Sequence, residues 1–366
     1  MAGIDLSDNK LDYLPETLFA NLESLKYLLL QRNILDVLNP KVFRDLKNLE
    51  TLDLSENKIT EFPPNIWEGL TSLTMLQLSR NGLTLWKDFQ GLTNLEELDL
   101  TGNKISSCES FRSMIKLKRL KLAENQIKIL PQGIFTGLHN LLVLNLQLNQ
   151  LEEIPIGIFH DFQNIATMDF SSNSISQIDR DTFKGLTTLH ELHISRNFIE
   201  IIKNDTFLDL ANLDRLSLYG NNIDTLELRA FQGLNNLTWL LLGNNIIHQL
   251  DYGTFDPVPL LIRLELDSND LRAVEENTFE AFQNLQSIKL GKNAWHCDCK
   301  ILYLANWIRD HSPIVWEYQP KCRGPGMLGG RPLHEMSFFD VCDGQWLSMQ
   351  RIPSRVTDKH AKITKD

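Results

Sequence analysis

The clearest pattern in this chain is a recurring phrase of apolar and polar positions that ends in asparagine. Counted from that asparagine, the residues eight, five and three before it and two and five after it are apolar, as in LeuGluThrLeuAspLeuSerGluAsn at 49–57. The alternation just before the asparagine predicts one short, half-buried strand in each repeat. The asparagines are 24 residues apart, with two steps of 22: Asn9, Asn33, Asn57, Asn81, Asn103, Asn125, Asn149, Asn173, Asn197, Asn221, Asn245, Asn269 and Asn293. Such a period predicts a solenoid whose strands stack side by side.

Two further features of the period support a solenoid. An asparagine amide has both donors and an acceptor, so inside a turn it can satisfy backbone groups of its own coil and of the next, as a buried loop requires. An aromatic ring also recurs ten residues after each asparagine, or eight in the short coils, and we expect these rings to form a buried spine on the convex side. They are Phe19, Phe43, Trp67, Phe89, Phe111, Phe135, Phe159, Phe183, Phe207, Phe231, Phe255 and Phe279.

The phrase L-x-x-L-x-L-x-x-N resembles the leucine-rich repeat. The resemblance implies an α/β solenoid, a right-handed horseshoe with a parallel sheet on its concave face. About twelve coils fill residues 1–293, a C-terminal cap is expected over 294–345, and 346–366 is a polar tail or linker. The chain begins within a repeat, so we expect its N-terminal cap to be missing, because solenoids cover their end coils.

Four of the five cysteines follow the last ladder asparagine: Cys297, Cys299, Cys322 and Cys342. Apolar Ile301, Leu304, Ala305 and Ile308 recur there at helical spacing. Four cysteines allow three disulfide connectivities. A structural zinc site is the alternative, but zinc modules bring ligands in close pairs, and Cys322 and Cys342 are 20 residues apart.

This segment resembles the cysteine-rich C-terminal cap of extracellular leucine-rich repeat proteins, such as Slit proteins, Toll-type receptors, peroxidasin and chaoptin-like proteins. The resemblance implies the pairs Cys297–Cys322 and Cys299–Cys342, and an extracellular location because disulfides persist in oxidising compartments. The fifth cysteine, Cys108, occupies an apolar position of the repeat and is expected to be a buried free thiol.

Two apparent catalytic motifs lack the structural context that their chemistry needs. HisGluLeuHis at 190–193 has its histidines three apart on a strand, whereas the zinc motif needs four on a helix; a weak metal contact of His193 with Glu191 is the alternative. The G-x-G-x-x-G of 324–329 lacks the flanking strand and helix of a dinucleotide fold. We therefore predict no enzyme activity, no resident metal and no cofactor.

The charge and hydropathy of the chain limit the classes of partner that it can bind. The net charge of −11 argues against a nucleic-acid partner, which normally meets a basic face. No apolar run approaches the roughly 20 residues that cross a bilayer. The sequons Asn204–Asp205–Thr206 and Asn236–Leu237–Thr238 lie outside the strands, so glycans there would leave the concave face clear.

The residues six, four and two before each asparagine should line the concave face. Most are polar, with acidic groups interrupted by Arg119 and Lys121, but Tyr219, Trp239 and Leu241 depart from this and are flanked by Arg215 and Arg263. Clustered Tyr, Trp and Arg dominate binding energy at protein interfaces. We therefore predict that these five residues bind a protein ligand.

Two functions remain open from the sequence. The first is an extracellular recognition module of the adhesion, receptor or innate-immune type that binds a protein on its concave face. The second is a structural role, in which the array self-associates as a homodimer or serves as the recognition arm of a larger matrix protein, receptor or enzyme.

Overall fold

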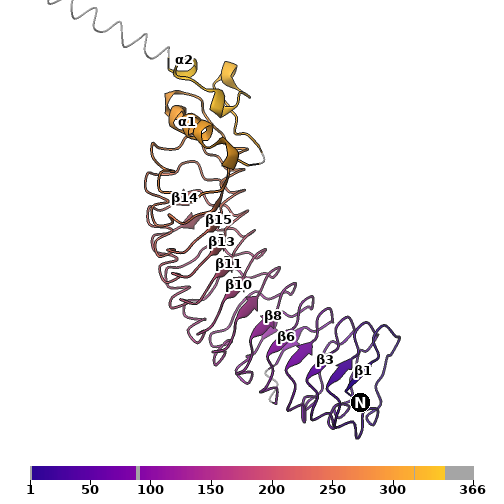
Figure 1. Cartoon of the computed structure of the whole chain (residues 1–366). Coiled ribbons are helices and arrows are strands. Elements are labelled where there is room, and N and C mark those ends of the chain that lie inside the picture. The colour runs from indigo at the N-terminus through magenta and orange to yellow at the C-terminus, as the bar shows by residue number, and fades with distance from the viewer. Residues whose placement is uncertain (1, 88–90, 317, 343–366) are drawn as a thin grey trace, which may run out of the picture.

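The computed structural model describes residues 2–87, 91–316 and 318–342, which form a curved solenoid closed at one end by a small helical cap (Figure 1). The tail predicted over 346–366 and the ring of Phe89 lie outside the described residues. The parallel-sheet solenoid and the cysteine-rich cap predicted from the sequence are confirmed.

Thirteen short strands of the described residues form one parallel sheet in chain order. Each pairs with the corresponding residues of the next coil, so that Arg215 is opposite Trp239 and Trp239 is opposite Arg263. The strands are β1 (Gly3–Asp5), β2 (Tyr27–Leu29), β3 (Thr51–Asp53), β4 (Met75–Gln77), β6 (Glu97–Asp99), β8 (Arg119–Lys121), β9 (Val143–Asn145), β10 (Thr167–Asp169), β11 (Glu191–His193), β13 (Arg215–Ser217), β15 (Trp239–Leu241), β16 (Arg263–Glu265) and β17 (Ser287–Lys289).

Two smaller parallel pairs lie past the asparagine turn of their coils: β5 (Leu85–Trp86) with β7 (Ser107–Cys108), and β12 (Ile201–Ile202) with β14 (Thr225–Leu226). They show that neighbouring coils stay in register beyond the main sheet. Every row of residues at a fixed distance from its asparagine is therefore a continuous line along the solenoid.

The ladder asparagines bond both their own coil and its neighbours, as predicted. The Asn221 amide nitrogen donates to the carbonyls of Ile194, 2.9 Å away in the preceding coil, and Leu218, 3.0 Å away in its own coil. Its oxygen accepts from the amide of Ile199 at 3.2 Å. The side chain is 5% exposed, so these bonds replace water for backbone groups inside the turn.

The aromatic spine is present. Successive rings of the row stack at centroid distances of 6.3 Å for Phe19–Phe43, 6.2 Å for Phe135–Phe159 and 6.2 Å for Phe231–Phe255. Trp86 lies five residues after Asn81, outside the row of spine rings, but it stacks on Phe111 at 5.6 Å. Its larger ring reaches into the spine at the short coils.

The cap continues directly from the last strand. It contains the short 3-10 helix η1 (Cys299–Ile301), α1 (Leu302–Asp310), η2 (Ser312–Ile314), η3 (Gly326–Leu328), η4 (Leu333–Glu335) and α2 (Phe338–Val341). Helix α1 buries Leu304, Ala305, Trp307 and Ile308, which confirms the helix expected from their spacing. Trp307 packs on the last spine ring, Phe279, at 5.0 Å, so the cap covers the end of the core.

Disulfide bonds join Cys297 to Cys322 and Cys299 to Cys342, the pairing that the resemblance implies. Cys108 is a free thiol with 2% of its surface exposed, and burial raises its pKa to about 12. A thiol reacts as the thiolate, so Cys108 is protected both by position and by protonation.

Asn221 and its exposed neighbour Asn222 provide a matched test of the ladder. Replacing Asn221 by Ala leaves buried backbone groups of two coils without partners, at roughly 1–3 kcal/mol for each orphaned group. We expect Asn221→Ala to lower the melting temperature strongly. Asn222→Ala should leave it nearly unchanged, because its coil-to-coil bond to Ile199 uses the main chain. Equal melting curves for the two variants would contradict the structural role of the ladder.

The cysteines give a second test. Non-reducing peptide mapping should find both cap disulfides, and Cys108 should stay unalkylated until the chain is unfolded. Reduction should destabilise the cap by roughly 2–5 kcal/mol, measured as earlier denaturant unfolding. Stoichiometric zinc together with four free cap thiols would refute the disulfide assignment.

Candidate ligand-binding surface

Four of the five residues predicted to bind a ligand lie on three adjacent strands, β13, β15 and β16, at the cap end of the concave sheet. Arg215, Trp239 and Arg263 share one register position. Leu241 occupies the next outward position, between Ser217 and Glu265. Tyr219 comes just after β13 and lies over Gly243 of the neighbouring coil. We call this five-residue set the concave platform.

Trp239 is held between two cations. The guanidinium carbon of Arg215 lies 4.7 Å from the centre of the indole ring, and that of Arg263 lies 5.0 Å from it. A guanidinium over an aromatic face is attracted by the ring's quadrupole, by roughly 0.5–1 kcal/mol at exposed sites. The two guanidinium groups favour this orientation of Trp239, and they leave the edge of the indole, rather than its faces, for a ligand.

Both arginines also have carboxylate partners. Arg215 lies 3.5 Å from Glu191 and 3.5 Å from Asp214. Arg263 pairs with Glu265, which also lies 3.1 Å from Lys289. The sequence predicted that these arginines flank the Trp239 cluster, and in the structure both are also paired with carboxylates. Their role at this surface is therefore to hold Trp239 in place as much as to present charge.

Gly243 brings Tyr219 close to the sheet. A Cβ at this position would lie 3.3 Å from Cδ2 of Tyr219 and 2.9 Å from Oδ1 of Asp267. Any larger residue would push both side chains away. The missing side chain therefore lets the phenol and the carboxyl close over the backbone beside Leu241.

Glu265 and Asp267 are two members of this surface that the sequence analysis did not single out. They lie four and two residues before Asn269, so the offset rule that located Tyr219 was sufficient to find them. Burial first, and then the nearby Glu265 charge, raise the pKa of Asp267. One of its oxygens, Oδ1, is buried and accepts no hydrogen bond from a described residue, which adds to the cost of ionising this carboxyl.

The middle of the concave face is occupied by ion pairs. Lys121 lies 2.8 Å from Glu97 and 3.6 Å from Asp99, and Arg119 lies 3.7 Å from Glu97. Burial opposes ionisation of Glu97, yet its hydrogen bond and charge interaction with Lys121 hold its pKa below the ordinary value. The basic step and its acidic neighbours therefore largely neutralise one another.

His193 lies 3.4 Å from Glu191, the contact considered as a weak metal site. In the described part of the chain, no group of three or more His, Cys, Asp or Glu side chains is arranged to hold a metal ion. The G-x-G-x-x-G glycines lie in the cap, around η3 and the Cys322 disulfide. Among the described residues around them, only the three-residue η3 is regular structure, and no strand leads into a helix as in a phosphate-binding turn.

The two sequons differ in how their asparagines are engaged. The Asn236 amide nitrogen donates to Ala211 at 3.0 Å, as do equivalent asparagines of other coils, such as Asn212 to Thr187 at 2.8 Å. This second asparagine ladder was not foreseen, although its spacing is visible in the sequence. Asn204 is exposed, and its side-chain oxygen accepts a hydrogen bond from the amide of Arg229 at 2.8 Å. The side-chain nitrogen of Asn204 is therefore better placed to carry a glycan than that of Asn236.

The repeats match the model of the family described as Leucine rich repeat over residues 24–83, 107–151, 139–197, 187–247 and 235–294, and a model of two such repeats matches 71–113. Since these segments cover more than half of the chain, the protein belongs to the leucine-rich repeat family. The fold and the sequence comparison therefore agree on the same family.

Individual relatives are more distant. Human platelet glycoprotein IX is 30% identical over 60 residues, which are 16% of this chain and 33% of that protein. Among solved structures, the TLR13–ssRNA13 complex contains a chain with a TM-score of 0.73 and 25% identity, over 92% of this chain and 53% of that one. The chain thus spans a third of platelet glycoprotein IX and about half of the TLR13-complex chain.

Two other structures show the same fold. A chain of the Drosophila Toll–Spatzle complex has a TM-score of 0.71 at 23% identity, over 93% of this chain and 55% of that one. A chain of the octameric complex of Latrophilin 3, Unc5D and FLRT2 has a TM-score of 0.66 at 23% identity, over 90% and 93%. Among the described residues, no helix is long and apolar enough to span a membrane.

The raised pKa of Asp267 leads to a stability test. A carboxyl whose pKa is raised by folding stabilises the fold when protonated, and that contribution is lost as the pH rises through the raised value. We expect Asp267→Asn to raise the melting temperature at neutral pH, because the amide removes a half-buried charge beside Glu265. The advantage should shrink as the pH falls and the parent Asp267 becomes protonated. Asp270→Asn, at an exposed position three residues away, should show no such pH-dependent gain.

Proposed function

We propose that this protein is an extracellular, non-enzymatic recognition module that binds a protein ligand at the concave platform. The main observation in support of this proposal is the Arg215–Trp239–Arg263 sandwich. It holds an aromatic side chain on a strand in the absence of ligand. A pre-organised Trp costs little conformational entropy on binding. Trp, Tyr and Arg are also the residue types that most often form interface hot spots.

The platform offers three kinds of contact within three coils. The edge of Trp239 and the side chain of Leu241 provide apolar area, Tyr219 adds a phenol, and the half-buried carboxyl of Asp267 lies next to the platform beside Tyr219. This combination suits a protein surface that presents an apolar side chain beside a hydrogen-bond donor. It does not suit the phosphate backbone of a nucleic acid, because the local arginines are already neutralised by Glu191, Asp214 and Glu265.

The similar folds support a recognition role. Toll is in complex with Spatzle, and FLRT2 is part of an assembly with Latrophilin 3 and Unc5D. TLR13 is in complex with an RNA, but the net charge of −11 of the present chain favours the protein class. The two cap disulfides support the extracellular location, and a glycan at Asn204 would leave the concave platform clear.

The ligand can be located and identified together. A photo-crosslinking amino acid placed at Leu241 should capture the partner from extracellular fluid, for identification by mass spectrometry. The same group at Tyr13, an exposed aromatic position 57% accessible, outside the strands and in the first coil, is the control and should not capture it. Capture of a second copy of this chain at Leu241 would favour the self-associating function instead.

Truncation of the anchor tests the energetics with the partner so identified. We expect Trp239→Ala to weaken binding by at least about 2 kcal/mol, or thirtyfold, in a titration. Stability should fall by only roughly 1–2 kcal/mol, because two cation–π contacts are lost. Phe231→Ala removes a buried spine ring and should cost roughly 3–5 kcal/mol of stability.

Tyr13→Ala is the matched aromatic control for binding. It should retain the affinity of the parent, because Tyr13 lies in the first coil, at the opposite end of the sheet from the concave platform. Parent-like binding by Trp239→Ala would exclude the concave platform as the ligand site, and the lateral and convex faces would then be examined.

A further inference from the structure

A second row of side chains changes its chemistry near the cap. The residues three after each ladder asparagine form a line on the lateral face of the solenoid, next to the asparagine turn. In the middle coils the row contains Glu152, Glu200 and Asp224, but in the last three coils it contains His248, Arg272 and His296. These three basic residues lie on successive coils. The backbones of adjacent coils are about 5 Å apart, as in neighbouring strands of a sheet.

The cap adds a fourth basic residue to this row. The amide of His296 donates to the carbonyl of Arg272 at 2.9 Å, and the amide of Arg323 donates to the carbonyl of Trp295 at 2.8 Å. The Cys297–Cys322 disulfide joins the residues next to His296 and Arg323. Arg323 is therefore fixed beside the last coil by main-chain bonds and a covalent link, independently of any ligand.

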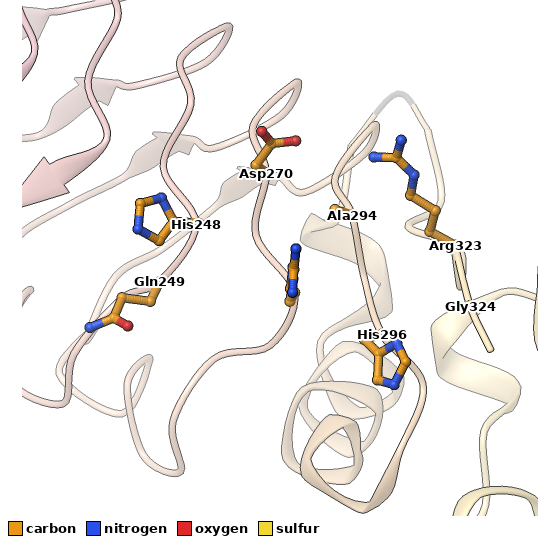
Figure 2. A pocket seen from close by; sticks show the side chains of 8 residues that line it. His248, Gln249, Asp270, Ala294, His296, Arg323 and Gly324 are labelled. Atoms are coloured by element: carbon orange, nitrogen blue, oxygen red, sulfur yellow. The ribbon is translucent and has the colours of Figure 1, made fainter.

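The four basic residues border a hollow of about 910 Å³ that also includes Gln249, Asp270, Ala294 and Gly324. Figure 2 shows the side chains of His248, His296 and Arg323 distributed along it, with Asp270 at one rim. A second hollow of about 690 Å³ shares His248, Gln249 and Arg272 and continues over Val274, Leu302 and Tyr303. We call the two together the cap groove.

The arginines of the cap groove differ from those of the concave platform in being unpaired. Within the described ranges, neither Arg272 nor Arg323 has a side-chain hydrogen bond or an ion pair, and both side chains are exposed. Arg215 and Arg263 each have carboxylate partners. Two free guanidinium groups beside two histidines, in a chain of net charge −11, form a local site for an anion. Planar guanidinium forks match carboxylate oxygens in pairs.

We propose that the cap groove binds an acidic segment of a protein partner, with carboxylates seated at Arg272 and Arg323. Acidic groups within the groove distinguish this ligand from a uniform polyanion: Asp270 lies at one rim, and Glu275 and Glu276 line the second hollow. A sulfated polysaccharide would be repelled there. A peptide also carries N–H donors that can meet Asp270 and apolar side chains that can pack on Leu302 and Tyr303. This site is separate from the concave platform.

The test uses the whole chain and a defined peptide. A fluorescein-labelled peptide in which Glu alternates with Ala and Leu is titrated with the protein, and its anisotropy is recorded at low and moderate salt. The same peptide with Gln at every Glu position is the ligand control. A size-defined heparin oligosaccharide serves as a competitor, to separate a peptide site from a polyanion site.

The variant is Arg272→Gln with Arg323→Gln, and its control is Arg80→Gln with Arg196→Gln. The control changes the net charge equally at exposed turns of distant coils. Melting curves and non-reducing mass analysis establish that the variants are folded and keep both disulfides. Trp239→Ala is included because it disables the concave platform without touching the cap groove, so failure of one site is distinguishable from failure of the other.

We expect the Glu peptide to bind and the Gln peptide to bind at least about tenfold more weakly, with affinity falling as salt screens the charges. The Arg272/Arg323 variant should lose at least about tenfold in affinity for the Glu peptide. The Arg80/Arg196 and Trp239 variants should bind as the parent does. Equal binding of the two peptides, parent-like binding by the groove variant, or tight binding of the heparin oligosaccharide without binding of the Glu peptide would each overturn the proposal.

Discussion

The structure depends on the hydrogen bonds that one asparagine side chain makes inside each coil. A loop that turns through the interior leaves main-chain groups without water, and those groups must find partners within the protein. Each buried asparagine has two donors and an acceptor, and it forms hydrogen bonds with them to two successive coils. Asn221, for example, bonds to Ile194, Leu218 and Ile199. The turn is thereby satisfied and the coils are locked in one register. The leucine rows and the phenylalanine spine then close the core around it.

This register converts sequence offsets into surfaces. Since neighbouring coils align residue by residue, a change of chemistry at one offset over a few repeats becomes a contiguous patch. Two offsets change near the cap: the concave positions gain Tyr219, Trp239 and Leu241, and the lateral row gains His248, Arg272 and His296. Both patches lie in the last coils, whereas the middle of the concave sheet neutralises its charges around Glu97 and Lys121.

The cap both covers the end of the core and contributes to the lateral patch. Trp307 packs on Phe279 and covers the open end of the hydrophobic core, which an uncapped solenoid would expose. The Cys297–Cys322 link then holds Arg323 next to His296, so that a residue outside the repeat period joins a row generated by the period. In this way the disulfide framework that stabilises the end of the array also positions a charge for ligand contact.

The sequence by itself determined the repeat, the strand positions, the buried asparagines and the outward direction of the five platform residues, because period and offset are local properties of a solenoid. It also contained, at fixed spacing, the second asparagine ladder, Asp267 and the basic lateral row, which become significant only once neighbouring coils are seen to be in contact. Tertiary structure alone decided the rest. It placed Arg215 and Arg263 on the two faces of Trp239 and paired them with Glu191, Asp214 and Glu265, while giving Arg272 and Arg323 no partner among the described residues. The reason is that pairing of charges depends on side-chain reach across coils and across the cap, a distance that no offset along the chain specifies.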